Sequence, residues 1–163
     1  MRSKSVSTDF ASFYAEARDD CLRTVLASTG DLDRARDLTD EAFARAWASW
    51  RKVSRHPAPR AWVVRTALNA GVSAWRRHRR EVLTDAVAPE TLTTSSQLVD
   101  PEVMAALRQL PPRQRQVVAL RIFLDLDTAA TAEVLGIAPG TVTAHLARAM
   151  ATLRTELTAK QER

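Results

Sequence analysis

The sequence predicts an all-α protein in which two small helical domains are joined by a flexible acidic linker. Apolar residues recur at steps of three and four over most of the 163 residues, as in amphipathic helices. No segment shows the alternation of apolar and polar residues that is typical of a strand. Residues 81–100 lack helical periodicity and are rich in Ser and Thr. We therefore expect domains at residues 1–80 and 101–163, with the linker at 81–100 between them.

Three helices are predicted in the first domain, at about residues 9–28, 31–50 and 59–80. Cys21 lies in the apolar stripe of the first helix, so we expect a buried and unreactive thiol. Gly30 is suited to end that helix, and Asp31 is suited to cap the next one. The prolines of the segment HPAP break the second helix and restrict the loop before the third.

The third predicted helix carries a face suited to nucleic acid. At 100° per residue, one ridge of this helix presents Trp62, Arg65, Asn69, Ser73, Arg76 and Arg80. Residues 51–80 carry nine basic residues and no acidic one, within a chain of net charge +5. Guanidinium groups neutralise phosphates, while Trp and Asn stack on or hydrogen-bond to an exposed base. A solvated basic face, with Trp62 completing the core, is the alternative interpretation.

The second domain is predicted to end in a helix-turn-helix, with helices at about 102–109, 112–124, 128–135 and 139–158. Ala132, Gly136 and Val142 stand where this motif needs a small residue at the crossing, a glycine in the turn and a branched packing residue. The outer face of the last helix presents Thr141, Thr143, Ala144, Ala147 and Arg148. Arg148 suits a guanine or a phosphate, but the low charge of this face predicts weak binding by the domain alone.

The ordered set of motifs resembles the bacterial extracytoplasmic-function (ECF) sigma factors, the small sigma-70-type promoter-recognition subunits of RNA polymerase. The motifs are DLTDEAFARAW, RAWVVRTALNAGVSAWRRHRR, LPPRQRQVVALR and TAEVLGIAPGTVTAHLARA, in this order. The resemblance covers about residues 9–158, and the composition is most similar to that of actinobacterial members. This family implies a protein without catalytic activity or cofactor, whose partners are core RNA polymerase and promoter DNA. An anti-sigma factor is a further partner known in the family.

The resemblance also implies roles for particular residues. Docking on polymerase would use Asp37, Asp40 and Glu41. Reading and melting of the −10 element would use Val53, Arg60, Trp62, Arg65, Asn69, Ser73, Arg76 and Arg80. Reading of the −35 element would use Thr141, Thr143, Ala144, Ala147 and Arg148. The chain departs from the common pattern at Asp40, where Gln is frequent, and at Ala138, where a capping Ser or Asp is frequent.

Other function classes fit the sequence less well. A free-standing helix-turn-helix regulator is the main alternative, but it leaves the first domain and the linker without a role. An enzyme would need a metal cluster or a nucleophile–base pair, and the chain offers three scattered His and one Cys. The longest stretch without a charged residue, 134–147, contains Gly and Pro and does not predict a membrane span. With no secretion signal and no room for a domain after the last helix, we expect a cytoplasmic protein.

Overall fold

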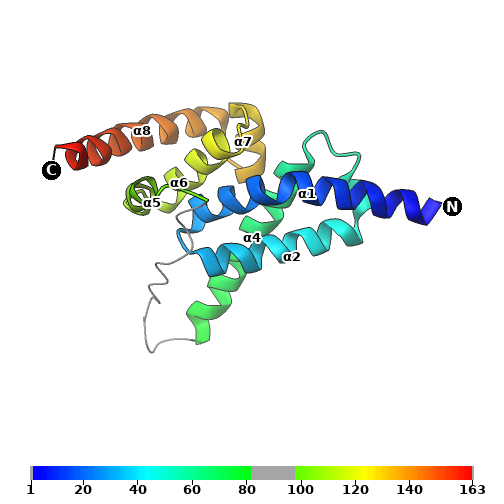
Figure 1. Ribbon diagram of the computed structural model, residues 1–163. Coiled ribbons are helices and arrows are strands. Elements are labelled where there is room, and N and C mark those ends of the chain that lie inside the picture. Colours follow the sequence, from blue (N-terminus) through cyan, green and yellow to red (C-terminus); the bar gives the residue numbers. More distant parts are fainter. Residues whose placement is uncertain (1, 82–97, 163) are drawn as a thin grey trace.

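The computed structural model describes residues 2–81 and 98–162, with side chains for 9–73 and 98–162. The first domain contains α1 (Arg2–Thr29), α2 (Leu32–Ala48), α3 (Trp50–Val53) and α4 (Pro59–Glu81). The second contains α5 (Pro101–Arg108), α6 (Pro112–Val118), a π-helix η2 (Ala119–Phe123), α7 (Thr128–Leu135) and α8 (Pro139–Gln161) (Figure 1). The predicted all-α class is confirmed, since the described residues form no strand. Most of the expected linker, 82–97, lies outside the described residues.

Aspartate side chains and prolines mark where several helices begin. Asp31 caps α2 by accepting a hydrogen bond from the Arg34 amide at 3.0 Å. Asp127 caps α7 in the same way, with the Ala130 amide at 2.7 Å. Helix α8 begins at Pro139 and has no side-chain cap, as expected from the alanine before it. These local signals place the observed helix starts close to the predicted ones.

Two of the predicted helices are interrupted in the structure. The helix expected at 31–50 ends at Ala48, and the short α3 follows after Ser49. The helix expected at 112–124 changes at Ala119 into a π-helix, whose wider turn carries one more residue. Just beyond it, Asp125 has a positive φ of 55°, so the chain reverses toward α7 without a glycine.

Helix α1 is shared by the two domains, because it lies between α2 on one side and α5–η2 on the other (Figure 1). Its buried residues Leu22, Val25 and Leu26 belong to one apolar core that also includes Leu107 of α5 and Leu120 of η2. We expected two domains joined by a flexible acidic linker. The structure also packs them on a common core, with burial of apolar surface as the main stabilising contribution.

Polar contacts to backbone carbonyls reinforce the packing of the two domains. Arg108 of α5 donates from Nε and Nη2 to the carbonyl oxygen of Gly30 at 3.1 and 2.9 Å. Gly30 ends α1 with a φ of 76°, and the carboxyl end of a helix attracts cations. Burial and the neighbouring Arg108 guanidinium lower the pKa of Arg115 on α6. The carboxyl end of α1 thus holds the second domain.

The helix-turn-helix has a small apolar core of its own. Val117, Ala132 and Val142 are buried together, and Leu135, Ile137 and Leu146 pack around them. Gly136 provides the turn with a φ of 64°, as predicted. The motif therefore forms as the sequence indicates, and it orients the outer face of α8 toward solvent.

Candidate nucleic-acid interface

The central part of the predicted ridge on α4 is exposed. Arg65, Asn69 and Ser73 are all open to solvent and follow one another along one side of the helix. Trp62 is half-buried and packs against the core, so its ring both supports the helix and reaches the surface. Arg76 and Arg80 extend the same helix, but their side chains lie outside the described residues. The described part of the ridge offers one guanidinium, one amide and one hydroxyl group.

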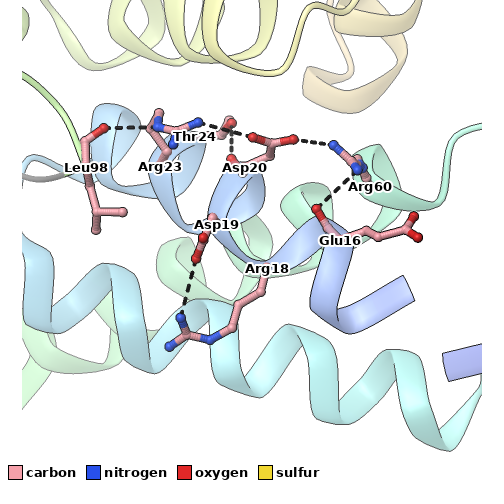
Figure 2. A network of polar contacts seen from close by, with 8 residues as sticks. All are labelled: Glu16, Arg18, Asp19, Asp20, Arg23, Thr24, Arg60 and Leu98. Atoms are coloured by element: carbon pink, nitrogen blue, oxygen red, sulfur yellow. Dashed lines mark hydrogen bonds and ion pairs between the residues drawn. The ribbon is translucent and has the colours of Figure 1, made fainter. Parts of the chain in front are cut away.

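Arg60, at the start of α4, is held by residues of α1 (Figure 2). Its Nη1 donates a hydrogen bond to Oδ2 of Asp20, with which it forms an ion pair. Its Nη2 donates to the carbonyl oxygen of Glu16 at 3.2 Å. The expected DNA-contacting group is therefore paired within the protein in this structure.

Val53 is placed differently from the expectation that it helps to hold a base. Its side chain is fully buried in the core at the end of α3, before the loop that leads to α4. Burial of a β-branched apolar residue positions that loop from the inside. Val53 therefore supports the loop, and its side chain is not available to a base.

Asn69 and Ser73 border the second domain as well as solvent. A cleft of about 310 Å³ lies between α4 and the second domain, and its walls include Asn69, Ser73, Arg113, Gln116 and Leu135. Arg113 donates from Nη1 to Oε1 of Gln116 at 3.1 Å. A nucleotide bound to Asn69 would therefore have to share this space with α6 and α7.

The predicted −35 face lies on the exposed side of α8. Solvent reaches all five of its residues, Thr141, Thr143, Ala144, Ala147 and Arg148. Thr143 donates its hydroxyl to the Pro139 carbonyl at 3.2 Å, which leaves its methyl group and its acceptor oxygen outward. This face offers one charged group, small apolar groups and hydroxyls, a combination suited to base edges and thymine methyls in a major groove.

The acidic residues predicted to dock on polymerase lie on the exposed side of α2. Asp37, Asp40 and Glu41 are exposed, and Glu41 pairs with Arg45 at 2.6 Å. Asp40 also borders a cleft of about 560 Å³ between α1 and α2. The other walls of this cleft are Phe10, Ala11, Tyr14, Phe43, Ala44 and Trp47, so the cleft is mainly aromatic. Phe10 packs on Trp47 with 4.9 Å between ring centroids.

Cys21 is fully buried, and burial raises the pKa of its thiol to about 12. The predicted burial of this thiol is thus confirmed. In residues 9–73 and 98–162 no group of three His, Cys, Asp or Glu is close enough to hold a metal ion. None of the described helices is long and apolar enough to cross a membrane.

Comparison with known proteins decides the family. Residues 13–81 match the family described as Sigma-70 region 2, and residues 101–153 match Sigma-70, region 4. The chain is 31% identical to the RNA polymerase sigma-E factor of Streptomyces coelicolor over 155 residues, which cover 93% of this chain and 88% of that protein. The chain belongs to the ECF group of the sigma-70 family. It is therefore a promoter-recognition subunit of RNA polymerase, with no enzymatic activity of its own.

Further relatives of this sigma factor agree in sequence and in fold. It is 33% identical to the ECF sigma factor SigL of Mycobacterium tuberculosis over 143 residues, which cover 83% of this chain and 81% of SigL. The sigma factor RpoE of Bartonella quintana, solved with the anti-sigma factor NepR, superposes with a TM-score of 0.76 at 22% identity. That superposition covers 92% of this chain and 97% of RpoE. The free-standing regulator is not favoured by these matches.

Several residues of the interface were not indicated by the sequence. Asp20 on α1 and Arg108 on α5 make contacts that join distant parts of the chain, through Arg60 and the Gly30 carbonyl. Neither side chain belongs to a motif. Each lies on a helix with other charged residues, so the sequence alone does not distinguish it from them. Coupled substitutions among related sequences would be the signal for the pair of Asp20 and Arg60, whereas a contact with a backbone carbonyl leaves no such signal.

Proposed function

We propose that this sigma factor directs core polymerase with two reading faces, α4 for the −10 element and α8 for the −35 element. The exposed ridge of Arg65, Asn69 and Ser73 on α4 is the observation that carries the proposal. The second face, around Arg148, lies in the other domain. Two faces on separate domains suit two DNA elements with a spacer between them, and the weakly charged α8 face gains affinity from its link to the basic α4 face.

At the −10 element, the α4 ridge acts on the separated strand. Arg65 binds a phosphate and fixes the register, and Arg76 and Arg80 extend this contact along the helix. Asn69 reads a base that has left the stack, through hydrogen bonds from its amide group. Trp62 supports the melted junction with its partly exposed ring. Unstacking a base costs a few kcal/mol, and these contacts offset that cost.

At the −35 element, the base-facing residues of α8 enter the major groove of intact duplex. Arg148 donates to a guanine edge or a phosphate, while Ala144 and Ala147 contact thymine methyl groups. Thr141 and Thr143 supply hydroxyl groups at the amino end of the same face. Because this face has a single charge, discrimination between sequences is expected to be modest, and polymerase supplies the remaining affinity.

Polymerase itself docks on α2. Asp37, Asp40 and Glu41 form an acidic strip there, and the aromatic cleft beside Asp40 accepts an apolar side chain of the partner. An acidic rim around an aromatic pocket is a common arrangement for a protein interface. An anti-sigma factor that covers the same strip would prevent docking. This sigma factor acts with polymerase on DNA in the cytoplasm.

The packed arrangement of the two domains does not allow both elements to be read. Asn69 and Ser73 face α6 and α7 across the cleft, so the second domain has to move away before a melted strand reaches α4. We therefore assign the structure to the state that precedes promoter binding.

Transcription with sigma-free bacterial core polymerase on a randomised promoter library tests the proposed function. Transcripts that depend on this protein should start at a fixed distance from two enriched elements. A folded protein that yields no dependent transcript, with a core that responds to another sigma factor, would contradict the proposal.

Arg148→Ala tests the assignment of α8 in the same assay. Loss of one base contact should reduce the enrichment of the −35 element by roughly 5- to 10-fold, while the −10 element remains enriched. Arg154→Ala is a matched control, since Arg154 is an exposed arginine further along α8. Equal loss at both elements, or the same loss in the control, would remove Arg148 from the reading face.

A further inference from the structure

One carboxylate on α1, that of Asp20, is shared by two guanidinium groups from different segments (Figure 2). Its Oδ2 accepts a hydrogen bond from Nη1 of Arg60, at the start of α4. Its Oδ1 accepts one from Nη1 of Arg23, one helical turn further along α1, at 3.1 Å. Because a single negative charge serves two cations, these three side chains together keep a net positive charge, and each arginine weakens the electrostatic hold of Asp20 on the other.

Arg23 extends this cluster to the second domain. Its Nε donates a hydrogen bond to the carbonyl oxygen of Leu98 at 3.0 Å. The next residue, Val99, is 5% exposed and belongs to the common core, and Asp100 then caps α5 through the Glu102 amide. Arg23 therefore links the shared carboxylate to the backbone at which the second domain begins.

The side chains of the cluster are open enough to exchange partners. The exposed fractions are 35% for Arg23, 38% for Asp20 and 41% for Arg60. Ion pairs at this degree of exposure contribute only about 0–1 kcal/mol, because water and salt compete with them. A DNA phosphate offers arginine short, charge-assisted and often bidentate hydrogen bonds. It is therefore an effective competitor for the Arg60 guanidinium.

The charge distribution explains why the competing carboxylate comes from α1. Residues 51–80 contain nine basic residues and no acidic residue, so Arg60 has no acidic partner in its own segment. Asp20 supplies one from 40 positions earlier in the chain. The Asp20 carboxylate thus accepts the Arg60 hydrogen bond that a phosphate oxygen would accept in a protein–DNA complex.

We propose that Asp20 is a positioning residue that holds Arg60 until a promoter phosphate replaces it, and that Arg23 couples this exchange to the docking of the second domain. The proposal rests on the proposed function, and it adds Arg60, at the start of α4, to the −10 face proposed there. When the second domain leaves α1, Arg23 loses the Leu98 carbonyl, pairs fully with Asp20 and releases Arg60 to DNA. The linkage is reciprocal. When a phosphate binds Arg60, Asp20 pairs with Arg23 alone, and this pair weakens the hydrogen bond between Arg23 and the Leu98 carbonyl.

Asp20→Asn tests the first half of this proposal, because the amide keeps the shape of the side chain and removes its charge. The measurement is the Kd of holoenzyme, assembled from core polymerase and the full chain, for a promoter fragment at several salt concentrations. We expect binding about 2- to 5-fold tighter than wild type at low salt. The slope of log K against log salt should stay close to that of wild type, because Arg60 contacts the same phosphate in both complexes.

Asp19→Asn is the matched control. Asp19 is the next residue, its side chain is 73% exposed, and it pairs with Arg18 at 3.7 Å. It carries the same charge but does not touch Arg60, so its Kd and salt slope should equal those of wild type. If Asp19→Asn and Asp20→Asn change DNA binding equally, the effect is one of net charge and the proposal is overturned.

Arg23→Gln tests the coupling. Without Arg23, Asp20 pairs with Arg60 alone and holds it more strongly, so DNA binding should weaken by about 3-fold. The same substitution should have no effect in the Asp20→Asn background or in the Arg60→Gln background. A 3-fold loss that persists in either background means that Arg23 acts on DNA directly, which contradicts the coupling.

The outcomes separate this proposal from the proposed function. Wild-type holoenzyme that does not bind the promoter fragment would refute the proposed function itself. Normal binding by wild type, with Asp20→Asn no tighter, would overturn only the role of Asp20. Asp20→Asn could fail as a test if it reduces the thermal stability of the first domain. In that case Arg23→Gln, compared with and without Arg60→Gln, still tests the coupling, because both variants keep Asp20.

Discussion

Substitution of Asn69 on α4 should affect open complex formation but not the binding of core polymerase. It is exposed and lies on α4, whereas the acidic strip belongs to α2, so Asn69→Ala should not change the affinity for core polymerase. Loss of its hydrogen bonds to a base should reduce open complex formation by roughly 3- to 10-fold. Permanganate reactivity of melted thymines and a core-binding titration measure the two steps. Val72→Ala, an exposed neighbour without a polar group, is the control, and equal losses in both steps would contradict the assignment.

Cys21 predicts a dependence of stability on alkaline pH. Burial raises the pKa of its thiol from 9.0 to about 12, so between these values the unfolded chain loses a proton that the folded chain keeps. The contribution to stability is fully present below pH 9. It falls above pH 9 by roughly 1.4 kcal/mol per pH unit. Urea unfolding of wild type and Cys21→Ala at pH 8, 9 and 10 should show this extra slope in wild type only.

At the scale of elements, the sequence was informative wherever a local signal sets the conformation. Prolines and caps placed the starts of α4, α5, α6 and α8, and Gly136 placed the turn of the helix-turn-helix. The π-helix after Val118 and the break at Ser49 were not predicted. Both occur inside continuous apolar periodicity, and packing against α1 decides the local geometry there. Helical propensity alone does not distinguish a π turn from an α turn.

The turn of the helix-turn-helix gives a prediction about backbone conformation. Gly136 has a φ of 64°, and a Cβ at this position would meet no atom within 4 Å. Gly136→Ala should therefore lower the free energy of unfolding by about 1–2 kcal/mol, through the left-handed conformation alone. Gly140 is equally uncrowded but lies in the first turn of α8 at an ordinary φ.

Gly140→Ala is accordingly the matched control for that prediction. It should stabilise the protein by about 0.4–1 kcal/mol, because alanine restricts the unfolded chain. Chemical denaturation of the two variants beside wild type measures both effects. Changes of the same sign in the two variants would contradict the role given to the conformation of Gly136.

At the scale of the whole molecule, the family could be predicted from the sequence, but the docking of the domains could not. Motif order indicated which helices are expected to read DNA. Of the expected residues whose side chains the structure describes, Val53 is buried, Arg60 and Trp62 are partly buried, and the rest are exposed. The contact of Arg108 with Gly30 uses a backbone carbonyl, which every residue type offers, so no sequence pattern marks it. The pairing of Arg60 with Asp20 spans 40 positions and depends on that same tertiary packing.

Arg108→Ala tests the contact that joins the carboxyl end of α1 to α5. The substitution removes two hydrogen bonds to the Gly30 carbonyl and leaves the apolar core in place. We expect a loss of about 1–3 kcal/mol in domain docking and a larger radius of gyration in small-angle X-ray scattering. Arg154→Ala, on the exposed side of α8, should leave the scattering curve unchanged. Identical curves for the two variants would show that the apolar core alone holds the domains together.

The shared position of α1 has a consequence for how the chain folds during its synthesis. One face of α1 packs on α6 and η2. The ribosome finishes α1 at Thr29, 83 residues before it reaches Pro112, where α6 begins. At bacterial translation rates this face waits roughly 4–16 s for its partner. During that interval Val25, Leu26 and their neighbours are covered by the first domain on one side only. A nascent chain of this length is therefore the species in which a chaperone has the most apolar surface to bind.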